Sequence, residues 1–221
     1  MPEHAFALIL ALRRSIIAYR DAVLAGRWQD SGQFCFFDYP VRDLHGQTLG
    51  IFGEGSIGQS VATIARGFGM KPLFAAHKGV KGLGPLYTPW EEALETSDVI
   101  TLHAPLMDAT RNMLGAAEFA KMKRKPLLIN TARGGLVDEV ALTAALHQGQ
   151  IAGAAFDVAS PEPPPKDHPL MKLAAERLPN FILTPHIAWS SLEARQEVAD
   201  QTISAVDAFL AGTPVRVVEP M

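Results

Sequence analysis

The sequence predicts an α/β protein built on a doubly wound parallel sheet with helices on both faces. Three observations predict this class. Short apolar runs without polar alternation, such as residues 99–103 and 127–130, are typical of strands that are buried on both faces. These runs alternate along the chain with helical or loop segments, as in crossover connections between parallel strands. A glycine-rich turn, residues 53–58, directly follows the apolar run at residues 49–52.

Composition limits the possible classes of protein. The 221 residues are 48% hydrophobic, which is enough for a full core in one large domain or in a domain with an appendage. The net charge of −3 is small and the basic residues are scattered, so nothing indicates a nucleic-acid partner. A single cysteine, Cys35, excludes a disulfide framework and the usual zinc sites. We therefore expect no metal and a cytoplasmic location.

The amino-terminal residues 4–24 have a helical pattern that is apolar round most of its circumference. The run 5–12 is too short to cross a membrane, and it lacks a basic head and a cleavage site. Such a helix must be covered by a domain or by a second subunit. We expect residues 1–40 to form a helical arm that makes a homodimer, with the aromatic residues at 34, 36, 37 and 39 packed against it.

The glycine turn has the spacing G-x-G-x-x-G. Gly53 would make the turn, Gly55 would let backbone amides approach a pyrophosphate, and Gly58 would let helix and strand pack closely. The helix that follows begins at Ser56 and Ile57, and its amino end carries a partial positive charge that attracts anions. An apolar face on this helix and a second strand behind it favour a Rossmann-type dinucleotide-binding unit over a merely structural glycine turn.

The remaining elements follow from periodicity and caps. Thr88, Pro89 and Glu91 have the pattern of a capping box at a helix start. Asp138 begins another helix, which Gly149 ends. Basic residues 121–125 are expected at a solvated helix end. Further strands are expected at residues 73–76, 151–158, 181–184 and 215–218, and a last helix at 191–210.

Reactive side chains follow three of the predicted strands. Arg133 follows residues 127–130, Asp157 and Glu162 follow the strand that begins at residue 151, and His186 follows residues 181–184. Ligands of open parallel sheets bind outside the carboxyl ends of the strands. Each residue alone has a structural explanation, but together they suit a site that reduces a carbonyl. An arginine can grip a carboxylate, and a histidine held by a carboxylate can protonate an alkoxide.

Three ordered motifs carry a family resemblance. Residues 130–135 (NTARGG), 156–163 (FDVASPEP) and 184–189 (TPHIAW), together with the glycine turn, resemble the D-isomer-specific 2-hydroxyacid dehydrogenases. Within this family, the tryptophan at the end of the histidine motif, Trp189, makes the sequence most similar to the hydroxypyruvate reductase and glycerate dehydrogenase branch. The resemblance implies Arg133 as ligand of the substrate carboxylate and carbonyl, His186 as acid/base, and Glu162 as the partner of that histidine.

The resemblance also implies Asp157 near the nicotinamide amide, with the loops at His103, Ala104 and Pro105 and at Thr131 and Ala132 lining the cofactor. With the glycine turn and the two residues that follow the second strand, the full predicted cofactor-binding set is Gly53, Gly55, Ser56, Ile57, Gly58, His77, Lys78, His103, Ala104, Pro105, Thr131, Ala132, Arg133, Asp157 and His186.

The sequence departs from the family in length. Members begin with a substrate domain of about a hundred residues, a usual domain size, before the segment that matches residue 4. We expect residues 41–190 to be the NAD(P)-binding domain and residues 191–221 to be the last helix and tail of an incomplete substrate domain. A shortened gene product or a misplaced start would explain this. The missing part of the substrate domain would form one wall of the active-site cleft. Because its loss would admit water and remove positioning of the substrate, we expect weak turnover or none.

The second departure concerns the cofactor. The acidic residue that binds the ribose of NAD, about twenty residues past the glycine turn, falls at Ala76, followed by His77 and Lys78. These residues make NADP at least as plausible as NAD.

Two hypotheses of different classes remain. The first is an NAD(P)-dependent reductase of small 2-keto acids such as hydroxypyruvate or glyoxylate. The second is a remnant that binds a nucleotide or a partner subunit without turnover. A methyltransferase that binds an adenosyl ligand at the glycine turn would leave Arg133, Glu162 and His186 unexplained.

Overall fold

The computed structural model describes residues 1–218. The chain divides into two compact units, Met1–His186 and Ile187–Met221, which we describe separately.

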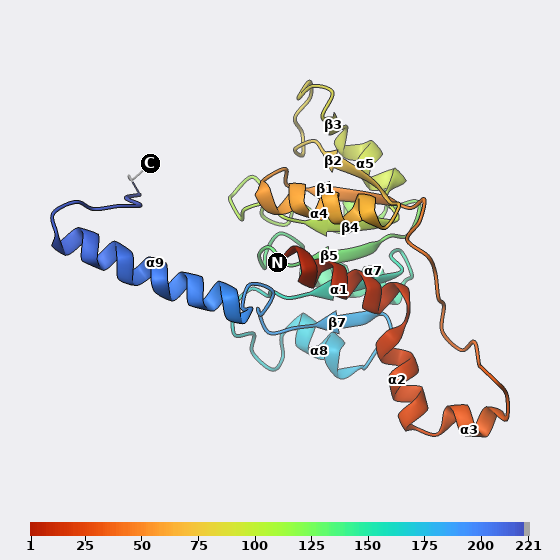
Figure 1. Ribbon diagram of the computed structural model, residues 1–221. Helices are drawn as coiled ribbons and strands as arrows, with labels where there is room; N and C mark the ends of the chain where they lie inside the picture. The colour runs from red at the N-terminus through yellow and green to blue at the C-terminus, as the bar shows by residue number, and fades with distance from the viewer. Residues whose placement is uncertain (219–221) are drawn as a thin grey trace. The chain divides into compact units, whose positions relative to one another are not determined.

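The first unit is built on one seven-stranded sheet in which every neighbouring pair of strands is parallel (Figure 1). Its strand order is β3-β2-β1-β4-β5-β6-β7, so the chain changes direction across the sheet between β1 and β4. This confirms the predicted fold class. The strands are β1 (Thr48–Phe52), β2 (Lys71–Ala75), β3 (Tyr87–Thr88), β4 (Val99–Leu102), β5 (Leu127–Asn130), β6 (Gly153–Phe156) and β7 (Phe181–Leu183).

Helices cover both faces of the sheet and divide the buried side chains into two clusters. One cluster packs α1 (Pro2–Arg13) and α4 (Ser56–Gly67) against strand residues such as Leu49 and Ile129. The other packs α5 (Trp90–Thr96), α6 (Ala116–Phe119), α7 (Glu139–His147) and α8 (Pro169–Ala175) against strand residues such as Leu128. Burial of both faces explains why the strands are apolar without alternation.

The single helix expected over residues 4–24 is interrupted in the structure. Ser15 adopts φ +50°, between α1 and α2 (Ile16–Leu24). Its hydroxyl donates to the carbonyl of Pro40 at 2.6 Å, and the Arg42 amide donates to the carbonyl of Arg13 at 3.0 Å. These long-range hydrogen bonds compete with helix continuation, which periodicity alone does not reveal.

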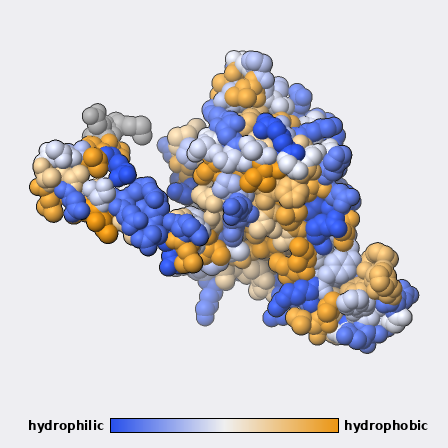
Figure 2. Space-filling view, in the orientation of Figure 1, coloured by the Kyte–Doolittle hydropathy of each residue, from blue (hydrophilic) through white to orange (hydrophobic). Residues whose placement is uncertain are grey.

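Beyond the break, α2 and α3 (Arg27–Ser31) lead into a long coil. Tyr19 packs against Phe36 and Tyr39, each with a ring-centroid distance of 5.3 Å, as expected. The prediction is wrong for Phe34 and Phe37, whose side chains are exposed. Apolar side chains are visible over α2, α3 and the coil, at the lower right of Figure 2.

Two further local predictions are wrong. Thr88 does not cap α5, because it is part of β3. Its carbonyl accepts from the Ala76 amide at 2.8 Å, and Pro89 is the N-cap residue of α5 instead. Residues 215–218 form no strand, since no neighbouring strand pairs with them. The predicted cap at Asp138 is confirmed: its carboxylate accepts from the amides of Val140 and Ala141.

The second unit consists mainly of α9 (Leu192–Leu210), which Ser191 caps by accepting from the Ala194 amide at 3.1 Å. Among the helices of residues 1–218, none is both long and apolar enough to cross a membrane.

Candidate active site

The carboxyl ends of the parallel strands bring the predicted site residues to one edge of the sheet. The glycine turn follows β1, His77 follows β2, and His103 follows β4. Arg133 follows β5, and Asp157 follows β6 directly. Backbone hydrogen bonding between the chain segments of β6 and β7 continues past the ends of these strands. The Thr184 amide donates to the carbonyl of Phe156, and the His186 amide donates to that of Asp157 at 2.8 Å. This backbone pairing fixes His186, at φ +55°, beside the β6 loop.

Two glycines of the turn, Gly53 and Gly58, pack closely against other backbone atoms, and the third, Gly55, borders open space. A Cβ on Gly53, which has φ +118°, would lie 2.5 Å from the backbone of His103, and a Cβ on Gly58 would overlap the carbonyl of Gly53. A Cβ on Gly55 would meet nothing within 4 Å. Gly53 and Gly58 are therefore fixed by packing inside the protein, whereas the space beside Gly55 is open to a ligand.

The amino end of α4 lies at this opening. Gly55 is the N-cap and offers no side-chain acceptor, while the first intrahelical bond runs from the Gln59 amide to the Gly55 carbonyl. The amides of Ser56, Ile57 and Gly58 thus remain available to an anion. Next to the turn lies a cavity of about 330 Å³, lined by residues from the ends of β1, β2 and β4, including Ala104 and Pro105. These features fit a dinucleotide.

The residues after β2 are engaged by carboxylates that the sequence did not indicate. Lys78 pairs with the buried Glu118 at 2.8 Å and donates to the carbonyl of Met113. His77 lies 3.4 Å from the carboxylate of Glu54, which belongs to the glycine turn. Burial acts to raise the pKa of Glu54, but hydrogen bonds from its own backbone and from His77 outweigh it and lower that pKa. An ionised carboxylate therefore lies at the end of β2 despite Ala76.

His186 and Glu162 form a close polar pair at this edge of the sheet. Nδ1 of His186 lies 2.6 Å from Oε2 of Glu162, and the other oxygen of Glu162 accepts from the Ala159 amide at 2.9 Å. A carboxylate on Nδ1 fixes the tautomer of the ring and leaves Nε2 as the nitrogen that can exchange a proton. Both side chains are about one-third exposed, so solutes can reach them. A cavity of about 620 Å³ lies beside the pair and reaches Asp157.

Arg133 lies on a loop that packs against the loop carrying Glu162. Asn130 holds this loop by donating to the Arg133 carbonyl and accepting from the Ala132 amide. A Cβ on Gly134 would overlap the carbonyl of Ala159, so only glycine allows the two loops to approach this closely. Thr131 and Ala132 are buried, whereas the Arg133 side chain is exposed. The guanidinium donates to the Ala132 carbonyl at 2.7 Å.

Asp157 is buried and has a partner that the sequence did not predict. Its Oδ1 accepts from the Thr184 hydroxyl at 2.5 Å and lies 3.7 Å from Nε2 of His4. His4 is at the amino end of α1, which reaches this edge of the sheet only through tertiary packing. His4 Nε2 also lies 3.3 Å from the Thr184 hydroxyl, and no local signal in the sequence links residues that are 180 positions apart.

A second His–Glu pair lies buried behind the loop of Glu162. Nε2 of His168 lies 2.9 Å from Glu139 and 3.0 Å from the carbonyl of Ser160, with side chains only 5% and 10% exposed for His168 and Glu139. Burial raises the pKa of Glu139. The contact with Ser160 connects this pair to the loop that positions Glu162.

His103 is uncharged at neutral pH. Burial, followed by repulsion from the amino-terminal ammonium group, lowers its pKa from 6.5 to about 4. Its Nε2 lies 3.0 Å from the Thr101 hydroxyl, and its buried Nδ1 has no hydrogen-bond partner among residues 1–218. Within the same residues, no group of His, Cys, Asp and Glu side chains is arranged to hold a metal ion.

The fold and the glycine turn define a dinucleotide-binding domain, and comparison with known proteins gives its family. Residues 6–188 match the family model of the D-isomer specific 2-hydroxyacid dehydrogenase NAD binding domain. The chain belongs to this family.

Three similar proteins illustrate the relationship. Glycerate dehydrogenase of Methylorubrum extorquens is 52% identical over 219 residues, which are 99% of this chain and 68% of that protein. The structure of D-lactate dehydrogenase with NAD⁺ from Lactobacillus jensenii matches with a TM-score of 0.82 and 31% identity, covering 100% of this chain and 68% of the other. The acyclic imino acid reductase Bsp5, in complex with NADPH and D-Arg, matches with a TM-score of 0.80 and 33% identity, covering 99% and 67%. The chain thus spans about two thirds of the length of these relatives.

The buried, neutral His103 predicts a specific pH dependence of stability. The unfolded chain takes up this proton near pH 6.5 but the folded chain only near pH 4, so the contribution to stability is complete above pH 6.5 and is lost as the pH falls. Between pH 7 and pH 5, the loss is about 2 kcal/mol in the free energy of unfolding. Urea unfolding of the protein and of His103→Gln measures it: the variant should lose about 2 kcal/mol less. Equal losses in both proteins would refute the assignment.

Proposed function

We propose that this chain carries the cofactor and catalytic half of an NAD(P)-dependent oxidoreductase that interconverts small 2-keto acids and D-2-hydroxy acids. The observation that supports it most is the His186–Glu162 pair at 2.6 Å on the same sheet edge as the glycine turn. The substrate class follows from the family and from its relatives, among them proteins named hydroxypyruvate reductase and glyoxylate reductase. We therefore propose hydroxypyruvate or glyoxylate as substrates.

Each catalytic side chain has a role that its contacts permit. Arg133, exposed on the loop after β5, would hold the substrate carboxylate through paired N–H donors and polarise the neighbouring carbonyl. His186 would deliver a proton from Nε2 to the alkoxide oxygen, while Glu162 on Nδ1 stabilises the imidazolium form. Thr131, Ala132 and Asp157 would line the nicotinamide side of the site, and His103, Ala104 and Pro105 would line the cofactor near the glycine turn. When bound, the nicotinamide supplies the hydride.

We also propose a homodimer formed through residues 1–40 and a cytoplasmic location. The dimer is supported by exposed apolar side chains on α2, α3 and the following coil, namely Ile16, Leu24, Trp28, Phe34 and Phe37. Large exposed apolar patches are typical of protein interfaces. The location is supported by the single, unpaired Cys35.

A second candidate is a chain that binds the cofactor without turnover. The observation in its favour is that the side chains of His186 and Glu162 are each about one-third exposed to solvent. Positioning of the substrate and exclusion of water both contribute to hydride transfer.

Steady-state kinetics with hydroxypyruvate and glyoxylate, followed by the oxidation of NADH and NADPH, should separate the two candidates. We expect turnover, and we expect His186→Gln to lower kcat/KM by about 10²–10⁴, the usual contribution of general acid catalysis. Arg133→Gln should chiefly raise KM. His147→Gln is the matched control, because His147 forms a comparable pair with Glu176 at 2.7 Å on α7, outside the site.

The control should retain full activity. Binding of NADH without any oxidation, or full activity in His186→Gln, would contradict the proposed reaction and favour the second candidate.

The choice between NAD and NADP depends on the end of β2. His77 and Lys78 would attract a 2′-phosphate, but Lys78 is held by Glu118 and His77 by Glu54. The ionised Glu54 would repel a 2′-phosphate and could accept from a ribose hydroxyl instead. We therefore propose that NADH binds at least as tightly as NADPH, in contrast to the expectation based on residues 76–78 alone.

Removal of the Glu54 charge tests this proposal. Glu54→Gln should tighten NADPH relative to NADH by about fivefold, the effect of about 1 kcal/mol of repulsion between charges in a solvated site. Fluorescence titration of both cofactors gives the ratio of dissociation constants. Glu92→Gln, which removes an exposed carboxylate on α5, should leave the ratio unchanged. An unchanged ratio in Glu54→Gln would show that Glu54 plays no part in the selection.

A further inference from the structure

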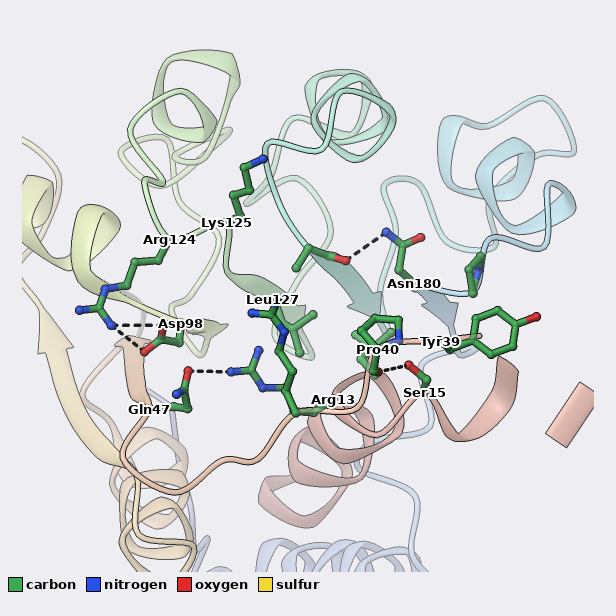
Figure 3. Close-up of a pocket in the computed structure, with 14 residues that line it drawn as sticks. Arg13, Ser15, Tyr39, Pro40, Gln47, Asp98, Arg124, Lys125, Leu127 and Asn180 are labelled. Atoms are coloured by element: carbon green, nitrogen blue, oxygen red, sulfur yellow. Dashed lines mark hydrogen bonds and ion pairs between the residues drawn. The ribbon is translucent and has the colours of Figure 1, made fainter. Parts of the chain in front are cut away.

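A separate cavity of about 260 Å³ lies at the opposite edge of the sheet from the glycine turn (Figure 3). Its walls include the residues just before four strands: Gln47 before β1, Asp98 before β4, Ala152 before β6 and Asn180 before β7. The end of α1 and the coil around Pro40 complete the walls. Because the strands are parallel, their amino ends cannot meet the carboxyl edge that carries the site described above.

The lining of this cavity carries an excess of positive charge. It contains Arg13, Arg42, Arg124 and Lys125 but only one acidic residue, Asp98. Asp98 is already engaged, since it accepts from the Thr48 amide at 2.8 Å and pairs with Arg124 at 3.1 Å. Within residues 1–218, no ion pair neutralises Arg13, Arg42 or Lys125. In Figure 3 the amino group of Lys125 points away from Arg13. Arg124 is paired with Asp98, so Arg13 and Arg42 are the arginines of this lining that carry the unpaired positive charge.

Arg13 is unusual because its guanidinium is buried with few partners. The residue is only 8% exposed, and one of its nitrogens donates to the Gln47 side chain at 2.7 Å. Its Nε is buried and has no hydrogen-bond partner in the described part of the chain. Burial, followed by repulsion from Arg42, lowers the pKa of Arg13, and attraction to Asp98 offsets this only in part. A buried cation whose charge is only partly compensated costs free energy, which an anion between Arg13 and Arg42 would offset.

We propose that this cavity binds a small oxyanion of the phosphate or carboxylate class, held by Arg13 and Arg42. The planar guanidinium offers parallel N–H donors that match both chemistries. Arg13 lines the cavity, and its Nε, which is itself buried, has no hydrogen-bond partner among residues 1–218. The cavity is slightly smaller than a typical ligand pocket of about 300 Å³ or more, so the ligand is a small molecule and not a nucleotide.

Titration with inorganic phosphate and, separately, with malonate tests the site. Saturating NADH should be present throughout, so that the glycine turn does not compete for phosphate. The Nε–Hε signal of Arg13 in ¹H–¹⁵N NMR reports on the guanidinium of a residue that lines the cavity. We expect a saturable shift of this signal with at least one anion, and the tighter of the two anions identifies the ligand class.

Matched variants make the test specific. Arg42→Gln, at an exposed residue, should weaken binding by about tenfold or more, the effect of losing one charged hydrogen-bond donor. Arg66→Gln removes the same charge from an exposed position on α4 and should leave the affinity unchanged. Arg13→Lys keeps the charge but removes the Nε donor, and it should also weaken binding, as followed by the amide signals of Gln47 and Asn180.

The proposal is overturned if neither anion shifts the Arg13 signal, or if Arg42→Gln binds as tightly as the unmodified protein.

Discussion

Parallel hydrogen bonding along seven strands forces every strand to end at the same edge of the sheet, and the candidate site depends on this constraint. The glycine turn, Arg133, Asp157 and His186 are far apart in the sequence, and each follows a different strand. The extra backbone bonds that continue the pairing past β6 and β7 then bring His186 beside the β6 loop. Close packing at Gly134 brings the Arg133 loop to the same place.

The sequence predicted those features that depend on neighbouring residues. The apolar strands, the glycine turn and the cap at Asp138 are local patterns, and the structure contains them. Features that depend on distant partners were missed. Helix α1 ends early because Ser15 bonds to Pro40, and Thr88 enters β3 because Ala76 pairs with it. The two-residue β3 and the short α6 and α8 are too brief to produce a periodic pattern.

The same distinction applies to the site. The position of His186 and Glu162 followed from strand order, because both residues lie just past the carboxyl ends of adjacent strands. The carboxylates around His77 and Lys78 did not, because Glu54 and Glu118 come from other loops. Nor did the contact of His4 with Asp157, which requires α1 to lie across the sheet. Helix α1 carries His4 at one end and Arg13 at the other, so it links the two edges of the sheet.

The central claim is that the carboxyl edge of the sheet binds the cofactor with its pyrophosphate at the amino end of α4. The most direct measurement is an amide NMR titration of the chain with NADH. Saturable shifts should appear at Ser56, Ile57 and Gly58, together with Asp157 and His186 across the edge. Shifts confined to the amino edge of the sheet, or no saturable shift at the glycine turn, would contradict the claim.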